Sequence, residues 1–184
     1  MAQYITNGLS LVLPPERLDR LVSGMGCHAY ASLDAHIRNA MLGHVSINVL
    51  NPAAAEYNEL QRDFIKHSLD VYKSFIRPMI PTSHMYHHNE DIPGVRKDGY
   101  SALELASADK TKAAITVFTV PGSKVQRVNI IPRGLDLSNT YRVTLDNTGE
   151  TMTVTGRDLL MNGVSTRTMG VMTSELILIE AAEA

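Results

Sequence analysis

Hydrophobic and polar positions follow two different patterns in the two halves of the chain. In residues 1–80, short apolar runs alternate with segments of helical periodicity. The runs Leu21–His28 and Val45–Leu50 are short and apolar, and the second is rich in β-branched residues, which is typical of buried strands. Helical segments precede, separate and follow them. The order helix, strand, helix, strand, helix predicts parallel βα units.

The helices of this half have recognisable ends. A short helix over Glu16–Leu21 can start at Pro15, because a first-turn position needs no backbone N–H. The helix between the two strands carries its apolar residues, Ile37 among them, on one side. A long helix is predicted over Asn51–Arg77, because Asn51 can cap it and the residue before a proline disfavours the helical region.

The second half shows the alternation that is typical of half-buried antiparallel strands. The predicted strands are Tyr100–Ala106, Ala113–Val120, Val125–Ile131, Tyr141–Leu145, Met152–Val154 and Ser174–Glu180, with a short helix at Gly156–Met161. Several short strands at this spacing predict a β-sandwich. His84–Lys97 is interpreted as a loop-rich junction, so the expected domains are residues 1–80 and 84–184.

Two buried parallel strands with their helices cannot form a stable domain alone. Their outer edges would leave backbone N–H and C=O groups and apolar faces without partners. Either a partner chain completes the sheet, or the sequence is one end of a larger unit.

A family resemblance explains this incompleteness. The segments that carry it are Gln3–Pro15, Gly24–His28, Arg38–His44, Val45–Leu50, Tyr72–Pro78, Arg133–Asp136, Tyr141–Glu150 and Thr173–Leu176. In this order they resemble the end of the catalytic barrel and the C-terminal β-domain of glycoside hydrolase family 36, the α-galactosidase (melibiase-like) family. The resemblance makes Gly24–His28 the seventh barrel strand and Val45–Leu50 the eighth. It implies an α+β chain: the last two βα units of a (β/α)8 barrel followed by an antiparallel β-sandwich.

The resemblance also implies what this chain lacks. Enzymes of the family retain configuration with two carboxylates, a nucleophile and a general acid/base, and no cofactor. Both carboxylates belong to barrel strands before the seventh, and neither motif occurs in this sequence. A whole barrel needs about 250 residues. We therefore expect no catalytic residue here, and no glycoside hydrolysis by the chain alone.

Three residues are candidates for contact with a sugar of the α-galactoside type in a completed barrel. Cys27 and His28 end the predicted seventh strand, and Asn48 lies near the end of the eighth. Barrel active sites form at the carboxyl ends of the strands, where polar groups can hydrogen-bond hydroxyls. The alternative interpretations are a small buried cysteine, a histidine bonded to a loop carbonyl and an asparagine that satisfies loop backbone.

Other polar clusters are interpreted as structural. His84, His87 and His88, with Glu90 and Asp91 close by in the sequence, suggest a metal site, but nearby prolines argue against the helix that would align them. A polar junction is favoured, and no metal site is predicted.

Two other pairs of titratable residues are also interpreted as structural. Asp34 and His36 are two apart on a helix and do not face each other, so a cap and a surface histidine are expected. Asp146 and Glu150 flank a tight turn and are expected to be solvated.

Composition and charge argue against a nucleic-acid-binding protein and a membrane protein. The chain has 17 basic and 19 acidic residues among 184, without a basic cluster of the kind that binds nucleic acid. No apolar stretch reaches the ~18 residues that span a bilayer. We expect a cytoplasmic protein without nucleic-acid or membrane partners, whose exposed barrel edges offer a surface for self-association.

Two other functions remain open on the sequence. The sandwich can be a non-catalytic module that binds carbohydrate or a protein partner, although the chain has no Trp for stacking on sugars. A metal-dependent enzyme at the histidines ranks last.

Overall fold

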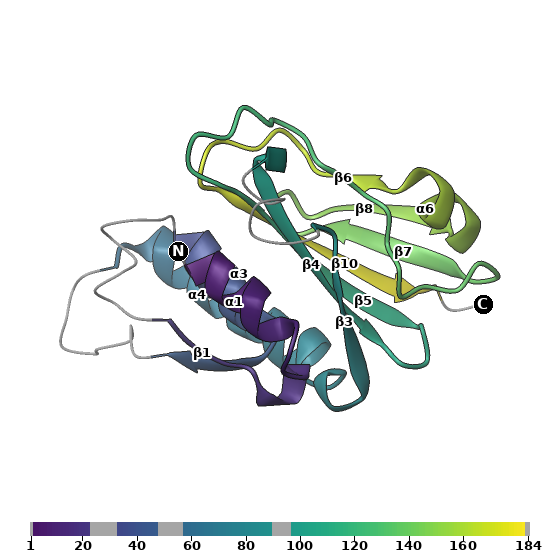
Figure 1. The fold of residues 1–184 in the computed structure, drawn as a ribbon, viewed down its shortest axis with the longest axis horizontal. Helices are drawn as coiled ribbons and strands as arrows, with labels where there is room; N and C mark the ends of the chain where they lie inside the picture. The colour runs from purple at the N-terminus through teal and green to yellow at the C-terminus, as the bar shows by residue number, and fades with distance from the viewer. Residues whose placement is uncertain (1, 23–32, 48–56, 90–96, 183–184) are drawn as a thin grey trace.

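The computed structural model describes residues 2–22, 33–47, 57–89 and 97–182. The first half is helical apart from two short strands. Its elements are α1 (Ala2–Ser10), η1 (Pro15–Arg17), β1 (Asp19–Val22), α3 (Leu33–Met41), β2 (His44–Ile47), α4 (Glu59–Val71), the π-helical turn η2 (Tyr72–Ile76) and η3 (Ile80–Thr82). β1 and β2 pair in parallel, and the helices lie between this pair and a larger sheet (Figure 1).

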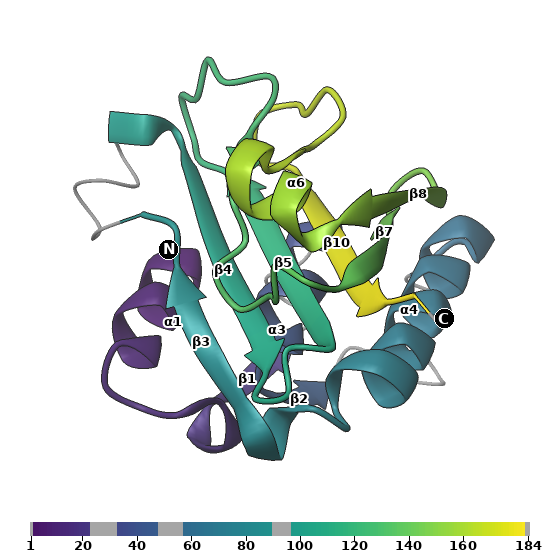
Figure 2. The same ribbon diagram turned by 90° about the vertical axis from the view of Figure 1, so that its right-hand side faces the viewer.

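The larger sheet has six strands, all antiparallel to their neighbours, in the order β3-β4-β5-β10-β7-β8. Its strands are β3 (Ser83–His87), β4 (Tyr100–Ser107), β5 (Lys112–Thr119), β7 (Thr140–Leu145), β8 (Glu150–Thr155) and β10 (Ser174–Ala181). A small pair, β6 (Asn129–Ile130) with β9 (Val164–Ser165), and the helix α6 (Gly156–Asn162) lie over the face away from the other helices (Figure 2).

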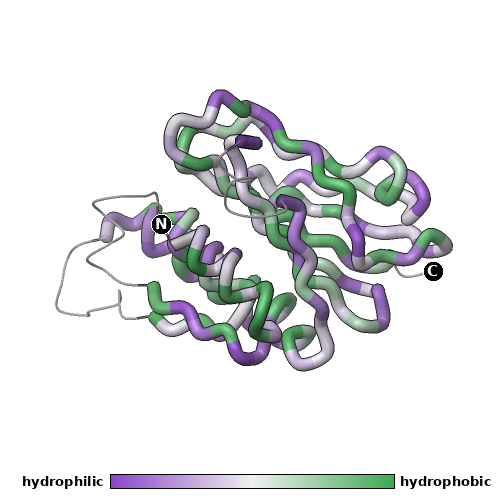
Figure 3. Tube along the Cα trace, viewed as in Figure 1, coloured by the Kyte–Doolittle hydropathy of each residue, from purple (hydrophilic) through white to green (hydrophobic). Residues whose placement is uncertain are grey.

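Both faces of this sheet are buried. On β4, Leu103 and Leu105 belong to a core shared with α3 and α4, whereas Ala102 and Ala106 belong to a second core shared with β6 and α6. Ile177 of β10 likewise lies in the second core. Figure 3 shows hydrophobic residues along these strands and along the helices packed on them. The chain is therefore a mixed helix and sheet protein whose antiparallel sheet is the central layer.

Most predicted strands of the second half are confirmed to within two residues, but other parts of the prediction are wrong. The structure has strand β3 in the segment that was interpreted as a loop junction, because Met85 pairs with Leu105 and extends the sheet by one edge strand. The short helix predicted over Glu16–Leu21 is wrong, because this segment contains only the turn η1, and β1 begins at Asp19. The predicted strand Val125–Ile131 is shortened to β6.

The long helix also begins later than predicted. α4 starts at Glu59, and Asn58 is its N-cap: the Asn58 side chain accepts from the Gln61 N–H, and the Gln61 side chain accepts from the Asn58 N–H. This reciprocal capping box satisfies two N–H groups that would otherwise lack partners. The predicted cap, Asn51, lies outside the described residues.

Gly134, in the segment before β7, packs closely against strand β4. A Cβ on Gly134 would lie 2.1 Å from the Ala106 Cβ and 3.1 Å from the Glu104 Oε1. We expect Gly134→Ala to lower the free energy of unfolding by about 1–3 kcal/mol through overpacking. Urea denaturation measures this. Gly8→Ala is the control, because a Cβ there meets nothing within 4 Å and should stabilise α1 slightly. Equal stability of the two variants would contradict the prediction.

Candidate functional site

The carboxyl ends of the two parallel strands define the candidate site. Val22 is paired with Ile47, and each is the last residue of its strand. Because the strands are parallel, the two segments that follow them start at the same end of the pair. The three predicted sugar-contacting residues, Cys27, His28 and Asn48, belong to those two segments and lie outside the described residues. Their contact with a sugar stays a prediction.

The two faces of the β1–β2 pair differ in their surroundings. Val22 is fully buried and packs with the helices, together with Val45 and Ile47. Strand alternation places Leu21 and Ser46 on the other face. There Leu21 is 61% exposed, and the Ser46 hydroxyl donates to the Asp19 Oδ1 at 2.7 Å. Within the described part of the chain, this face has no layer covering it.

Arg20, on β1, is an unusual feature of this pair. Its Nε and Nη2 atoms are buried, and they have no hydrogen-bond partner within the described ranges. Burial lowers the pKa of Arg20, and the neighbouring Asp19 opposes this shift. A buried guanidinium normally has acceptors. Arg20 therefore marks a position where an acceptor from outside the described residues would stabilise the protein.

The start of α3 is tied to the sheet by a polar cluster, which we call the α3–sheet cluster: Asp34, Arg38, Asp146, Asn147 and Ser174. Arg38 and Ser174 are its buried members. The Asp34 Oδ2 accepts from the Ser174 N–H at 2.9 Å and from its hydroxyl at 2.7 Å. Arg38 is 1% exposed and pairs with the Asp146 Oδ2 at 2.6 Å. Its Nη1 donates to the Asn147 Oδ1 at 2.7 Å and to the Ser174 carbonyl at 2.9 Å.

Three further side chains surround this cluster. His67, on α4, contacts the second oxygen of Asp146 through its Nε2 at 2.7 Å. The Phe64 ring lies 5.5 Å from the Arg38 guanidinium carbon, within cation–π range. Glu175 is 1% exposed, and its Oε1 accepts from the N–H groups of Asn147 and Leu176. Burial raises the pKa of Glu175, although these hydrogen bonds and Arg38 oppose the shift.

The α3–sheet cluster changes the interpretation of Asp146 that was made from the sequence. Asp146 was expected to be solvated, but it is almost fully buried and paired with Arg38, because the turn after β7 packs against α3. Glu150 is exposed, as expected, and forms an ion pair with Arg167. Asp34 anchors the first turn of α3 to Ser174. It therefore fixes one end of the segment that carries Cys27 and His28.

Two of the three histidines after η3, His87 and His88, have structural partners, and His84 is exposed. The Nε2 of His87 lies 2.8 Å from the Ser10 hydroxyl oxygen and 3.3 Å from the Asn7 carbonyl oxygen, so it joins β3 to α1. Burial lowers the pKa of His87. The Nε2 of His88 lies 2.9 Å from the Glu104 Oε2. In the described residues, no three potential metal ligands come together. Glu90 and Asp91 lie outside them.

Glu104 is a fully buried carboxylate in the middle of β4. It accepts from the backbone N–H groups of Arg133 and Gly134, at 2.9 and 2.8 Å, as well as contacting His88. Glu104 and Arg38 are not among the candidate residues predicted from the sequence. One sequence feature could have identified them: each is a charged residue among apolar ones, Glu104 in a strand and Arg38 in a helix. A charged side chain that is buried in such a place requires a partner.

Comparisons with known proteins show where this fold occurs. No family model matches the sequence, and no curated protein matches it. The galactosidase domain of an alpha-galactosidase-sucrose kinase matches 98% of this chain with a TM-score of 0.78 and 18% identity. The alpha-galactosidase from Lactobacillus brevis matches 96% of it with a TM-score of 0.77 and 17% identity.

The extent of these matches fits the resemblance seen in the sequence. This chain spans 24% of the length of each of the two solved chains. It therefore has the fold of about a quarter of an α-galactosidase chain. No helix among the described residues has the length and apolar character needed to cross a membrane.

Proposed function

We propose that this chain acts as the C-terminal part of an α-galactosidase-like retaining glycoside hydrolase. It supplies the last two βα units of the catalytic barrel and braces them with the antiparallel sheet. The observation that carries the proposal is the parallel β1–β2 pair, backed by helices that pack on the sheet. The match of nearly the whole chain to part of two α-galactosidase structures supports it.

The unpaired edges of β1 and β2 fit this role. Within the described residues these strands pair only with each other, whereas every barrel strand has two neighbours. Leu21 faces the uncovered side, and Leu11 and Val12, after α1, are 58% and 75% exposed. A polypeptide with the preceding barrel strands would pair with the edges and cover these apolar side chains. A second copy of the chain can occupy the same edges, which gives concentration-dependent self-association.

The chemical contribution of the chain is to one wall of the sugar pocket. Cys27, His28 and Asn48 follow the carboxyl ends of β1 and β2, where barrel enzymes bind their substrates. Polar side chains there would hydrogen-bond the hydroxyls of an α-galactoside. The α3–sheet cluster holds the helix that follows the first of these segments, so the sheet contributes to the position of the pocket wall. Both reacting carboxylates come from the remainder of the barrel.

The proposal predicts that the purified chain alone does not release the leaving group from an activated α-galactoside. It also predicts association with a polypeptide carrying the first six βα units of an α-galactosidase barrel. Leu21→Lys should abolish this association, because it places a charge on the face that the partner covers. Analytical ultracentrifugation measures binding, and a colorimetric assay measures hydrolysis.

Leu60→Lys is the matched control for this experiment. Leu60 lies on α4 and is 80% exposed, so its replacement should leave association unchanged. Hydrolysis by the chain alone would contradict the proposal. Equal effects of the two lysine variants, or no association of the unsubstituted chain, would also contradict it.

A further inference from the structure

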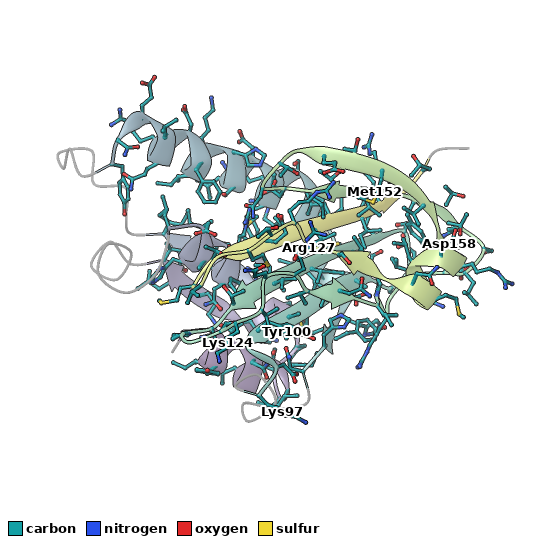
Figure 4. The ribbon with its side chains drawn as sticks, turned by 90° about the horizontal axis from the view of Figure 1, so that it is seen from above. Lys97, Tyr100, Lys124, Arg127, Met152 and Asp158 are labelled. Carbon is teal, nitrogen blue, oxygen red and sulfur yellow. The ribbon has the colours of Figure 1, made fainter. Side chains whose placement is uncertain are left out.

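A small cavity lies between the segment before β4 and the turn after β5, away from the β1–β2 pair. Its volume is about 270 Å³, and it is lined by Lys97–Gly99 and Val120–Val125. Ligand pockets in proteins usually measure about 300–1,000 Å³, and this cavity lies just below that range, so only a ligand as small as one sugar ring would fit. Figure 4 labels Lys97 and Lys124, which come from the two different segments.

Two lysines, Lys97 and Lys124, line the cavity, and neither has an anionic partner among the described residues. Among the residues that the structure describes, no carboxylate lies within ion-pair distance of Lys97 or Lys124. Other exposed cations, such as Arg142 and Arg167, do have carboxylate partners. Two lysines that line one cavity, without a carboxylate partner in the described part of the chain, favour a ligand with a negative charge.

The third charged residue of the cavity is held in place. The Asp98 Oδ2 accepts from the Nδ2 of Asn89 at 3.0 Å, and Asn89 is only 2% exposed. The Oδ1 of Asn89 in turn accepts from the Ala102 N–H at 2.9 Å. A carboxylate fixed in this way repels a bare anion but accepts hydrogen bonds from hydroxyl groups.

The backbone shapes the cavity as well. Gly99 has a φ of +78°, and a Cβ on it would lie 2.9 Å from the Ser123 Oγ and 3.3 Å from the Val125 Cγ2. The Ser123 Oγ accepts from the Val125 N–H at 3.1 Å, which fixes the turn. The close approach of Gly99 to this turn therefore depends on the missing side chain.

We propose that this cavity binds a small sugar that carries an anionic group, a phosphate or a carboxylate. The ammonium groups of Lys97 and Lys124 pair with the anion, and the Asp98 carboxylate accepts hydrogen bonds from the sugar hydroxyls. A sugar phosphate and a uronic acid share this chemistry. The cavity contains no aromatic side chain, so recognition depends on charge and hydrogen bonds. Binding here needs no barrel strand and can be tested on this chain.

Isothermal titration of the full chain with galactose 6-phosphate, galacturonate, galactose and inorganic phosphate tests the proposal. We expect at least one of the two anionic sugars to bind more tightly than both galactose and inorganic phosphate. The first two ligands distinguish a phosphate from a carboxylate. Lys97→Gln and Lys124→Gln should each weaken binding about threefold to fivefold, as for the loss of one partly exposed ion pair.

Lys66→Gln is the matched control, because Lys66 is an exposed lysine on α4, outside the cavity. It should leave the affinity unchanged. Galactose binding as tightly as both anionic sugars, or inorganic phosphate binding as tightly as both, would overturn the proposal. Equal effects of the three lysine variants, or no binding of either anionic sugar at millimolar concentration, would overturn it too.

Discussion

Replacing Arg38 by alanine is expected to lower the free energy of unfolding by about 3–5 kcal/mol, the usual cost of removing one partner of a buried ion pair. The change leaves the buried Asp146 carboxylate without its guanidinium, and the Ser174 carbonyl and the Asn147 side chain each lose a donor. It also opens a cavity beside Phe64. Urea denaturation followed by circular dichroism measures the loss.

Two further variants make this experiment specific. Arg142→Ala removes an exposed arginine that pairs with Glu180, and it should change stability by at most about 1 kcal/mol. Arg38→Lys should not restore stability, because a single ammonium cannot serve acceptors that lie in several directions around a planar guanidinium. A loss for Arg38→Ala as small as that for Arg142→Ala would show that the buried pair contributes little.

Replacing Glu104 by alanine is expected to cost a similar amount, about 3–5 kcal/mol. Three donors lose their acceptor at once: the N–H groups of Arg133 and Gly134 and the ring of His88. Because the site is fully buried, water cannot replace the carboxylate without opening the structure. Glu104→Gln keeps one oxygen acceptor and should lose less. Thermal and urea denaturation of both variants measure the difference.

The control for Glu104 is Glu180→Gln, which removes a partly exposed carboxylate charge near the carboxyl end of β10, a central strand of the same sheet. Glu180 pairs with the exposed Arg142, so we expect only a small change in stability. A double-mutant cycle of Glu104→Ala with His88→Ala isolates the contribution of their contact. If Glu104→Ala were as stable as the unsubstituted chain, the position of residues 133–134 would not depend on this carboxylate.

The strands of the second half could be predicted because their local patterns match their surroundings. Tyr141 and Val143 alternate with polar residues on β7, and the turn after β7 contains Gly149 with a φ of +68°. β4 and β5 are central strands, buried on both faces, and most of their residues are apolar. In each case the strand or turn is indicated by residues that are close together in the sequence.

The α3–sheet cluster could not be predicted in the same way. Arg38 and Asp146 are separated by 108 residues, so their pairing depends on how the helices pack on the sheet. Strand β3 was missed for a related reason: Met85 is in a strand because Leu105 lies opposite it. The predicted sugar-contacting residues stay predictions, since the described residues do not include them.

The central position of β10 has a consequence for folding kinetics. β10 pairs with β5 on one side and β7 on the other, although residues 174–181 come after all the other strands of the sheet. Each of the hairpins β4–β5 and β7–β8 can form from neighbouring segments, but they join only through β10. Such distant pairing carries a high loop-closure entropy and slows folding. During synthesis, the two sub-sheets therefore keep open edges until residues 174–181 emerge, and chaperone demand should be greatest in this interval.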